Sequence, residues 1–153
     1  MTTEVLFYHL ERQPLETVLP TLIERVVERG WRAVIEIGNA DRVQALNALL
    51  WTYKPESFLP HGTSADGPPA EQPVYLTSEP DNPNNATVRF LVEGAAPTTF
   101  TGYNRVVVLF DGRNPDALAA ARTHWKAAKA VKDADVKLTY WQQSQDGRWE
   151  QKA

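Results

Sequence analysis

The order of elements in the first fifty residues constrains the fold more than any other feature of the chain. Residues 4–9 and 31–37 are short and apolar, as buried strands are. Residues 15–27 and 41–50 carry apolar side chains three and four positions apart, which predicts amphipathic helices, and Gly30 is suited to end the first of them. The resulting β-α-β-α order is typical of a parallel sheet with crossover helices.

The rest of the chain continues this alternation. Further strands are predicted at residues 74–77, 87–92, 105–110 and 136–141, and an alanine-rich helix at residues 117–131, preceded by Asn114 as N-cap and Pro115 as first helical residue. We therefore expect an α/β protein with a single-domain, Rossmann-like three-layer α/β/α fold over residues 1–142 and a mainly parallel sheet. Residues 143–153 are expected to form a polar C-terminal tail that frays.

Composition and charge exclude several classes of protein. The formal net charge of −3 speaks against a general nucleic-acid binder. The chain has no cysteine, which excludes disulfides and thiolate nucleophiles and suits the reducing cytoplasm. The first residues lack the basic and apolar regions of a signal peptide, and no apolar stretch approaches the roughly 20 residues that cross a bilayer. We expect a cytoplasmic protein without membrane contact.

The sequence offers no clear cofactor or metal site. The turn after residues 31–37 holds Gly38 alone instead of a glycine-rich dinucleotide fingerprint. Gly62 and Gly67 have the spacing of a phosphate loop, but Pro68 and Pro69 stand where Lys and Ser/Thr are required. The histidines His9, His61 and His124 do not pair at metal-ligand spacing. We expect no cofactor, no metal and no catalytic residue.

A hydrolytic site is the alternative that the residues leave open. His61 lies near Asp66 and two serines, Ser57 and Ser64, so a small α/β hydrolase using these side chains can be drawn. The Gly-x-Ser-x-Gly context that holds such a nucleophile is absent. A loop histidine that hydrogen-bonds to the backbone is the favoured interpretation of His61.

The stretch from Trp51 to Pro73 predicts a long irregular loop with an unusual aromatic content. It holds five prolines and two glycines, which disfavour helix and sheet interior, yet its first half is apolar and aromatic. Loops of this length are uncommon in compact domains and are usually functional or disordered, and disordered segments are depleted in aromatic residues. The loop therefore predicts either a partner-binding surface or a segment packed over its own domain.

A basic helix is the second candidate site. Residues 113–137 hold six Lys or Arg and three Asp, in an otherwise acidic chain. On the helix, Leu118, Arg122, Trp125, Lys126 and Lys129 share one side. Guanidinium and ammonium groups beside a ring and an apolar end suit a short acidic peptide with a hydrophobic end and a free carboxylate. The alternative is a solvated helix face with Trp125 turned into the core.

Several stretches resemble one known family, the chi subunit of bacterial DNA polymerase III. They are Leu50-Trp51, Pro55 to His61, Gly67-Pro68 and Pro73-Val74, together with the Phe7-Tyr8 pair that ends the first strand and the late run Ala121 to Lys126. The resemblance extends over essentially the whole chain in element order. Its specificity depends mainly on the long, gap-free run from Trp51 to His61.

The resemblance implies a non-enzymatic accessory subunit that is monomeric on its own. In the family, chi binds the psi subunit and through it the clamp loader, and it also binds the acidic C-terminal tail of single-stranded DNA-binding protein. Its contact with DNA during replication is then indirect, at the replisome on the nucleoid. By position, Trp51 and Phe58, with the adjacent Leu59 and Pro60, match the psi-facing surface, which in the family also receives a repair helicase.

The same resemblance assigns the basic helix to the tail of single-stranded DNA-binding protein. Arg122, Trp125 and Lys126 match the family's tail-binding helix, and Lys129 extends it by one turn. Trp125 stands where a tyrosine is common, and Leu118 stands where a lysine can occur, which implies a lower or differently distributed affinity for the tail. A third hypothesis, direct binding of a single strand by Trp125 and the lysines, is disfavoured by the net negative charge.

Overall fold

The computed structural model describes residues 3–11, 13–52, 61–63, 67–95, 103–130, 136–144 and 148–152, with only the backbone at residues 51 and 52. The strands are β1 (Thr3–Leu10), β2 (Ala33–Ile37), β3 (Val74–Thr77), β4 (Val88–Val92), β5 (Arg105–Asp111), β6 (Val136–Gln143) and β7 (Trp149–Gln151). The helices are α1 (Leu15–Glu28), α2 (Val43–Thr52) and α3 (Pro115–Lys129), with short 3-10 turns η1 (Ala40–Arg42) and η3 (Pro69–Glu71).

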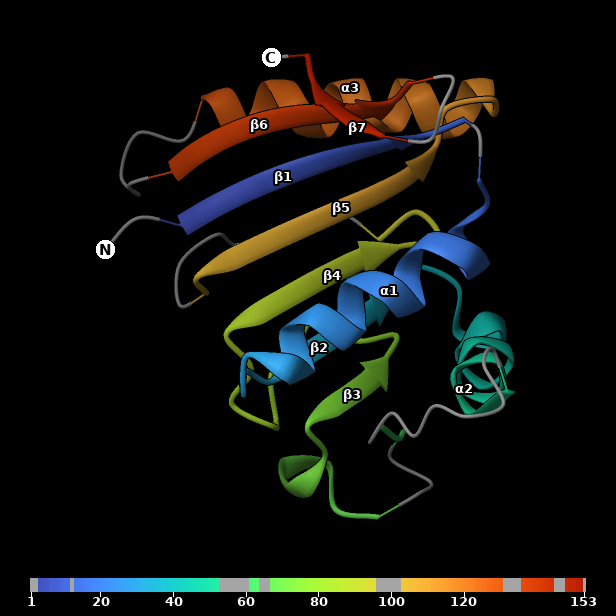
Figure 1. Cartoon of the computed structure of the whole chain (residues 1–153), viewed down its shortest axis with the longest axis vertical. Coiled ribbons are helices and arrows are strands. Elements are labelled where there is room, and N and C mark those ends of the chain that lie inside the picture. The colour runs from blue at the N-terminus through green and yellow to red at the C-terminus, as the bar shows by residue number, and fades with distance from the viewer. Residues whose placement is uncertain are drawn as a thin grey trace.

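The seven strands form one sheet in the order β3-β2-β4-β5-β1-β6-β7 (Figure 1). Every neighbouring pair is parallel except β6 and β7, which are antiparallel. β1 lies between β5 and β6, so the first strand of the chain is paired on both sides with strands from its last third. The expected α/β fold with a mainly parallel sheet is confirmed.

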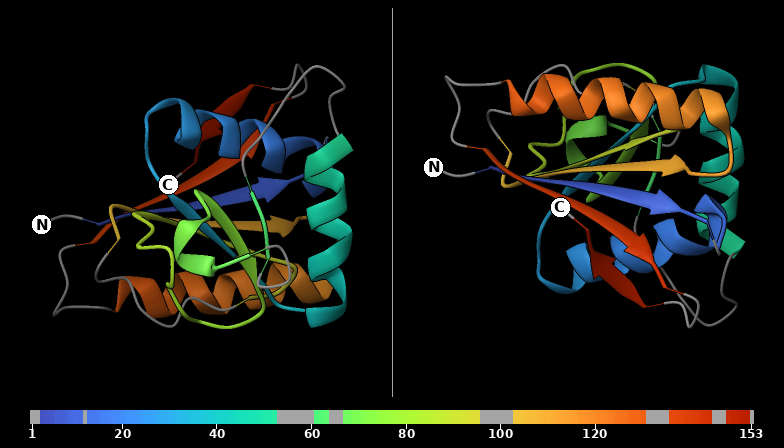
Figure 2. Two further views of the ribbon diagram at one scale, coloured as in Figure 1. Left: turned by 90° about the horizontal axis from the view of Figure 1, so that it is seen from below. Right: turned by 90° about the horizontal axis from the view of Figure 1, so that it is seen from above.

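Helices α1 and α3 cover opposite faces of the sheet, and α2 lies across one end of it (Figure 2). Side chains of each strand alternate between two cores, because successive residues in a strand point to opposite faces. The core beneath α1 includes Leu19 and Ile23 of the helix with Ile35 and Phe90 of the strands. The core beneath α3 is built largely from Phe7, Val106, Val108, Ala121 and Ala128.

The helix ends follow the sequence signals. The side chain of Asn114 accepts hydrogen bonds from the backbone N–H groups of Asp116 (2.9 Å) and Ala117 (3.2 Å), so it caps α3 as predicted. Gly30, with φ +75°, follows the end of α1 in the left-handed conformation that glycine tolerates. Pro20 lies inside α1 and is buried, and the helix continues through it.

Two parts of the chain differ from the expectations. β7 lies within the tail that was expected to fray: it pairs with β6, and the Trp149 ring packs edge-on against Tyr8 with centroids 4.8 Å apart. The Trp149 ring supplies an apolar contact that the polar residues around it cannot make, and this contact holds β7 against the sheet. In the expected loop, α2 continues through Trp51 and Thr52, and Gly62 bridges to Tyr75 on the edge strand β3.

Candidate functional site

The basic side of α3 presents its cations to solvent. Arg122, Lys126 and Lys129 are exposed, and no ion pair of theirs is found among the described residues. Trp125 is half-buried between these cations and the sheet. We call these four residues the basic strip. Its cations are therefore available to an acidic partner.

Trp125 is held in place by two aromatic neighbours. Its ring meets Phe7 of β1 with centroids 5.4 Å apart and Tyr140 of β6 with centroids 5.6 Å apart, both edge-on. The Tyr140 hydroxyl is 2.6 Å from Nδ1 of His9, so the tyrosine is fixed in turn. Trp125 was expected either to form part of a binding face or to turn into the core. Each interpretation is met in part, because the indole contacts the core and also borders the exposed cations.

Tyr140 is a member of this site that the sequence analysis missed. Burial raises the pKa of its hydroxyl, whereas the nearby positive charge of Arg122 acts in the opposite direction. The ring is half-buried, as is Leu138 on the same face of β6. The alternation of Val136, Leu138 and Tyr140 in the sequence was the signal that could have found it. Together with Trp125, these side chains form an apolar shelf beside the basic strip.

The aromatic loop lies mostly outside the described residues. Phe58, Leu59 and Pro60 fall there, and of Trp51 only its backbone, in the last turn of α2, is described. The flanks are described: Leu50, a residue of α2, is buried, and the backbone of Gly62 exchanges hydrogen bonds of 3.0 Å with Val74 and Leu76. The proposed loop surface therefore begins and ends at the β3 side of the sheet.

His61 has the structural environment of a core residue. Its side chain is buried, and its Nε2 donates to the backbone oxygen of Asn47 at 3.1 Å. Asp66, Ser57 and Ser64 lie outside the described residues. The favoured interpretation of His61 as a histidine bonded to the backbone is confirmed, and the hydrolase alternative is not favoured.

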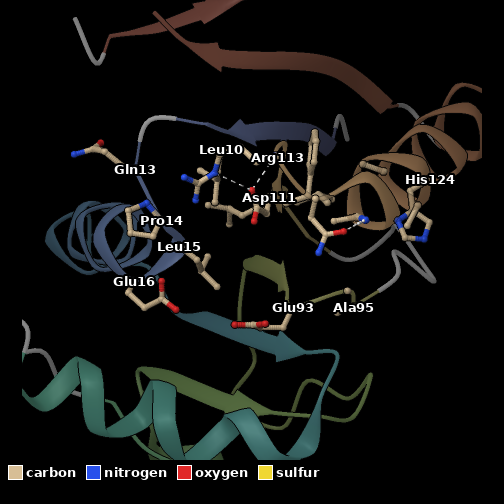
Figure 3. Close-up of a pocket in the computed structure, with 18 residues that line it drawn as sticks. Leu10, Gln13, Pro14, Leu15, Glu16, Glu93, Ala95, Asp111, Arg113 and His124 are labelled. Carbon is tan, nitrogen blue, oxygen red and sulfur yellow. Dashed lines mark hydrogen bonds and ion pairs between the residues drawn. The ribbon is translucent and has the colours of Figure 1, made fainter. Parts of the chain in front are cut away.

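A pocket of about 540 Å³ lies at the carboxyl ends of β1, β4 and β5, between the N-terminal turn of α1 and α3 (Figure 3). The chain leaves β1 towards α1 on one face and leaves β5 towards α3 on the other. In open α/β sheets, ligands bind in the crevice formed by such a divergence. The pocket is therefore the place where a nucleotide-binding relative of this fold would hold its ligand.

The polar groups around this pocket do not suit a phosphate. Glu16, Glu93 and Asp111 place carboxylates in its wall, the first two bridged by Arg42 at 3.2 Å each. The guanidinium of Arg113, which also lines the pocket, pairs with Asp111 at 3.5 Å. The N–H of the residue after Asp111 donates to the Leu10 carbonyl at 2.8 Å, and the Asn114 side chain occupies two N–H groups at the start of α3. A phosphate binds to free N–H groups at the start of a helix, and here two of those groups are already bonded to the Asn114 side chain.

Other kinds of site find little support in the part of the chain that the structure describes. His124, at the far wall of the pocket, has a pKa lowered by burial, and no titratable partner accompanies that shift. No three His, Asp or Glu side chains gather there as metal ligands would. Within the same residues, no helix has the length and apolar character needed to cross a membrane.

The carboxylate of Glu36 is likewise engaged in structure. Glu36 is buried and bonds to Arg89, while the nearby Asp41 is exposed. The charge on Arg89, in a strand that is otherwise apolar, was the signal for this pairing. The two carboxylates therefore do not form an acid–base pair.

Comparison with known proteins supports the resemblance seen in the sequence. Residues 1–137 match the family described as "DNA polymerase III chi subunit, HolC". A relative in Rickettsia prowazekii (strain Madrid E), named "Probable DNA polymerase III subunit chi", is 36% identical over 85 residues, which are 56% of this chain and 52% of the relative. The chain thus spans about half the length of that relative. The family match covers all three helices and most of the sheet, and by it the chain belongs to the DNA polymerase III chi subunit family.

Proposed function

We propose that this chain is a non-catalytic accessory subunit of the DNA polymerase III holoenzyme. In this proposal it connects the psi subunit, and through it the clamp loader, with the acidic C-terminal tail of single-stranded DNA-binding protein. It would act in the cytoplasm, at the replisome. The single observation that carries the tail-binding half is the basic strip, whose three cations face solvent beside half-buried rings.

The geometry around the basic strip matches the chemistry of such a tail. A terminal carboxylate can be gripped by the Arg122 guanidinium through two parallel hydrogen bonds. The hydrophobic end of the tail can lie on the shelf of Trp125 and Tyr140, next to Arg122. Lys126 and Lys129 lie one and two turns further along α3, where they attract the preceding acidic residues.

The test is a titration with a peptide of that tail. We expect Arg122→Ala to weaken binding by about 1.5–3 kcal/mol, the range for hydrogen bonds to charged groups. A wild-type titration with the same peptide amidated at its C-terminus should show a loss of similar size. Arg25→Ala is the matched control, because it removes the same charge from an exposed helical position on α1. Equal affinities of wild type and Arg122→Ala would contradict the proposal.

The psi-binding half depends on the aromatic loop. We expect Phe58→Ala to abolish co-purification with psi while the fold is retained, because truncating a buried interface anchor can cost 2 kcal/mol or more. The measurement is a pull-down with tagged psi, with circular dichroism to confirm the fold. Arg122→Ala should pull down psi as well as wild type does. An unchanged yield for Phe58→Ala would place the psi contact elsewhere.

A further inference from the structure

A second group of cations lies on the α1 face of the sheet, away from the basic strip. Arg25 of α1, Arg29 just after its end and Arg105 of β5 line a pocket of about 100 Å³ together with the rings of Tyr8 and Trp31. We call these five residues the arginine pocket. Its floor is apolar, formed by side chains of α1, β1, β4 and β5. Nothing in the proposed binding of psi or the tail uses it.

Cation–ring contacts organise the arginine pocket. The guanidinium carbon of Arg29 lies 5.0 Å from the centre of the Trp31 ring, and that of Arg105 lies 5.3 Å from it. Such contacts hold the guanidinium carbon over the ring and leave N–H groups free for another acceptor. Two arginines are thus held beside one indole.

The charge of the arginine pocket is only partly neutralised. Arg105 pairs with Glu4 at 3.4 Å, whereas among the described residues no ion pair involves Arg25 or Arg29, both of which are exposed. The positive charges of Arg105 and Arg25 also reach Tyr8, where they oppose the rise in its pKa that burial causes. Three guanidiniums against one carboxylate leave the pocket positive, although the chain as a whole carries −3.

A row of aromatic rings adjoins the pocket. Tyr8 stacks on Trp141 of β6, with ring centres 6.4 Å apart and planes 24° apart, and meets Trp149 of β7 edge-on at 4.8 Å. Trp141 and Trp149 are both half-exposed. A surface with guanidiniums next to flat rings matches single-stranded DNA, which carries phosphates next to bases. Bases of any sequence can stack on aromatic side chains.

We propose that the arginine pocket binds the phosphate backbone of single-stranded DNA, with neighbouring bases lying against Trp141 and Trp149. The pocket has the size for a phosphate group, and too little room for a whole nucleotide. An acidic peptide would satisfy the arginines equally well but would leave the rings unused. The net charge of −3 speaks against direct DNA binding by the chain as a whole, but the clustering of positive charge on this face makes such binding possible locally.

The test is fluorescence anisotropy with a labelled oligo(dT) strand at low and moderate salt. We expect the double variant Arg25→Ala/Arg29→Ala to bind at least tenfold more weakly at low salt and to show a salt slope smaller by about 1.4, because two phosphates of a single strand are then no longer neutralised. Trp141→Ala should bind about fivefold or more weakly, because a base can no longer stack there. Both arginines are exposed, Arg25 at a helical position where alanine is favourable and Arg29 just after the helix, so the fold should be retained.

The matched control is the double variant Arg122→Ala/Lys126→Ala, which removes the same charge from the opposite face and should bind oligo(dT) like wild type. Loss of binding in this control, with binding kept in Arg25→Ala/Arg29→Ala, would overturn the proposal. So would the absence of binding by wild type at low salt. Tighter binding of poly-glutamate, or equal binding of a duplex of the same length, would show that the pocket recognises another anion.

Discussion

Arg89 occupies an unusual place for a charged residue. It lies on the α3 side of β4, with its side chain 3% exposed, and bonds to the buried carboxylate of Glu36 on β2. It also donates to the Tyr103 hydroxyl at 2.8 Å and to the backbone carbonyls of Asp81 (3.0 Å) and Glu79 (3.3 Å). These acceptors belong to segments that cover the sheet beside α3. The ion pair therefore ties the covering segments to the sheet.

This pair leads to the first stability prediction. Glu36→Leu leaves the Arg89 charge buried without its carboxylate, which typically costs about 3–5 kcal/mol. We expect the urea midpoint to fall accordingly, with an unchanged dependence on denaturant. The double variant Glu36→Leu/Arg89→Met should recover most of the loss, since a buried pair can be replaced by apolar residues of similar volume.

An exposed pair provides the control for this prediction. Glu150 and Lys152 are 3.2 Å apart and each half-exposed, so Glu150→Gln should change the free energy of unfolding by no more than about 0.5 kcal/mol. If Glu36→Leu were equally harmless, Arg89 would be held by its carbonyl and hydroxyl acceptors alone.

At the scale of elements, α3 joins the stability of the fold to the proposed tail site. Its helical register places Ala121 and Ala128 against the sheet and the basic strip outside. The small alanines bring the helix close to β5 and β6, so that Trp125 can reach Phe7. The cap residue at its start fixes where this register begins.

We expect Asn114→Ala to lower the free energy of unfolding by about 1 kcal/mol, because two backbone N–H groups lose their acceptor. Chemical denaturation measures this change. Asn114→Asp should retain most of the stability, as its carboxylate can accept the same bonds near the positive end of the helix dipole. A loss in Asn114→Asp as large as in Asn114→Ala would show that the cap does not act through these bonds.

The sequence predicted elements well where one local signal was strong. The β-branched run at β5 and the Asn-Pro start of α3 both formed as expected. The strand order was not predictable, because β1 pairs with β5 and β6, which lie about a hundred or more residues away. β7 was missed for the same reason, since its anchor Trp149 packs on Tyr8 from the opposite end of the chain.

The candidate site was predictable in its residue types and less so in its geometry. Helical spacing alone placed Arg122 and Lys126 on one side of α3, and both are exposed. Helical spacing could not decide whether Trp125 faces the core, because the indole is wide enough to reach both the buried side of the helix, where the alanines lie, and solvent. The contribution of Tyr140 depends on where β6 lies in the sheet, which no local pattern fixes.

For the whole molecule, the sheet separates the two positively charged surfaces. The basic strip lies on α3 and the arginine pocket lies on the α1 face, with the sheet between the two helices (Figure 2). In the proposed roles, the basic strip binds the acidic tail of single-stranded DNA-binding protein. The arginine pocket binds single-stranded DNA, which is the ligand of that same protein. The fold would then place both ligands on one small domain without a shared residue.

This separation predicts that the two ligands bind independently. Charges further apart than a Debye length, about 10 Å at 0.1 M salt, are largely screened. We expect saturating tail peptide to leave the affinity for oligo(dT) unchanged within about 0.5 kcal/mol, and the effects of Arg122→Ala and Arg25→Ala to add within the same margin. Anisotropy of labelled oligo(dT), titrated with and without peptide, measures both. Displacement of the strand by the peptide would mean that both occupy one surface, and Arg25→Ala would then weaken the binding of the peptide as well.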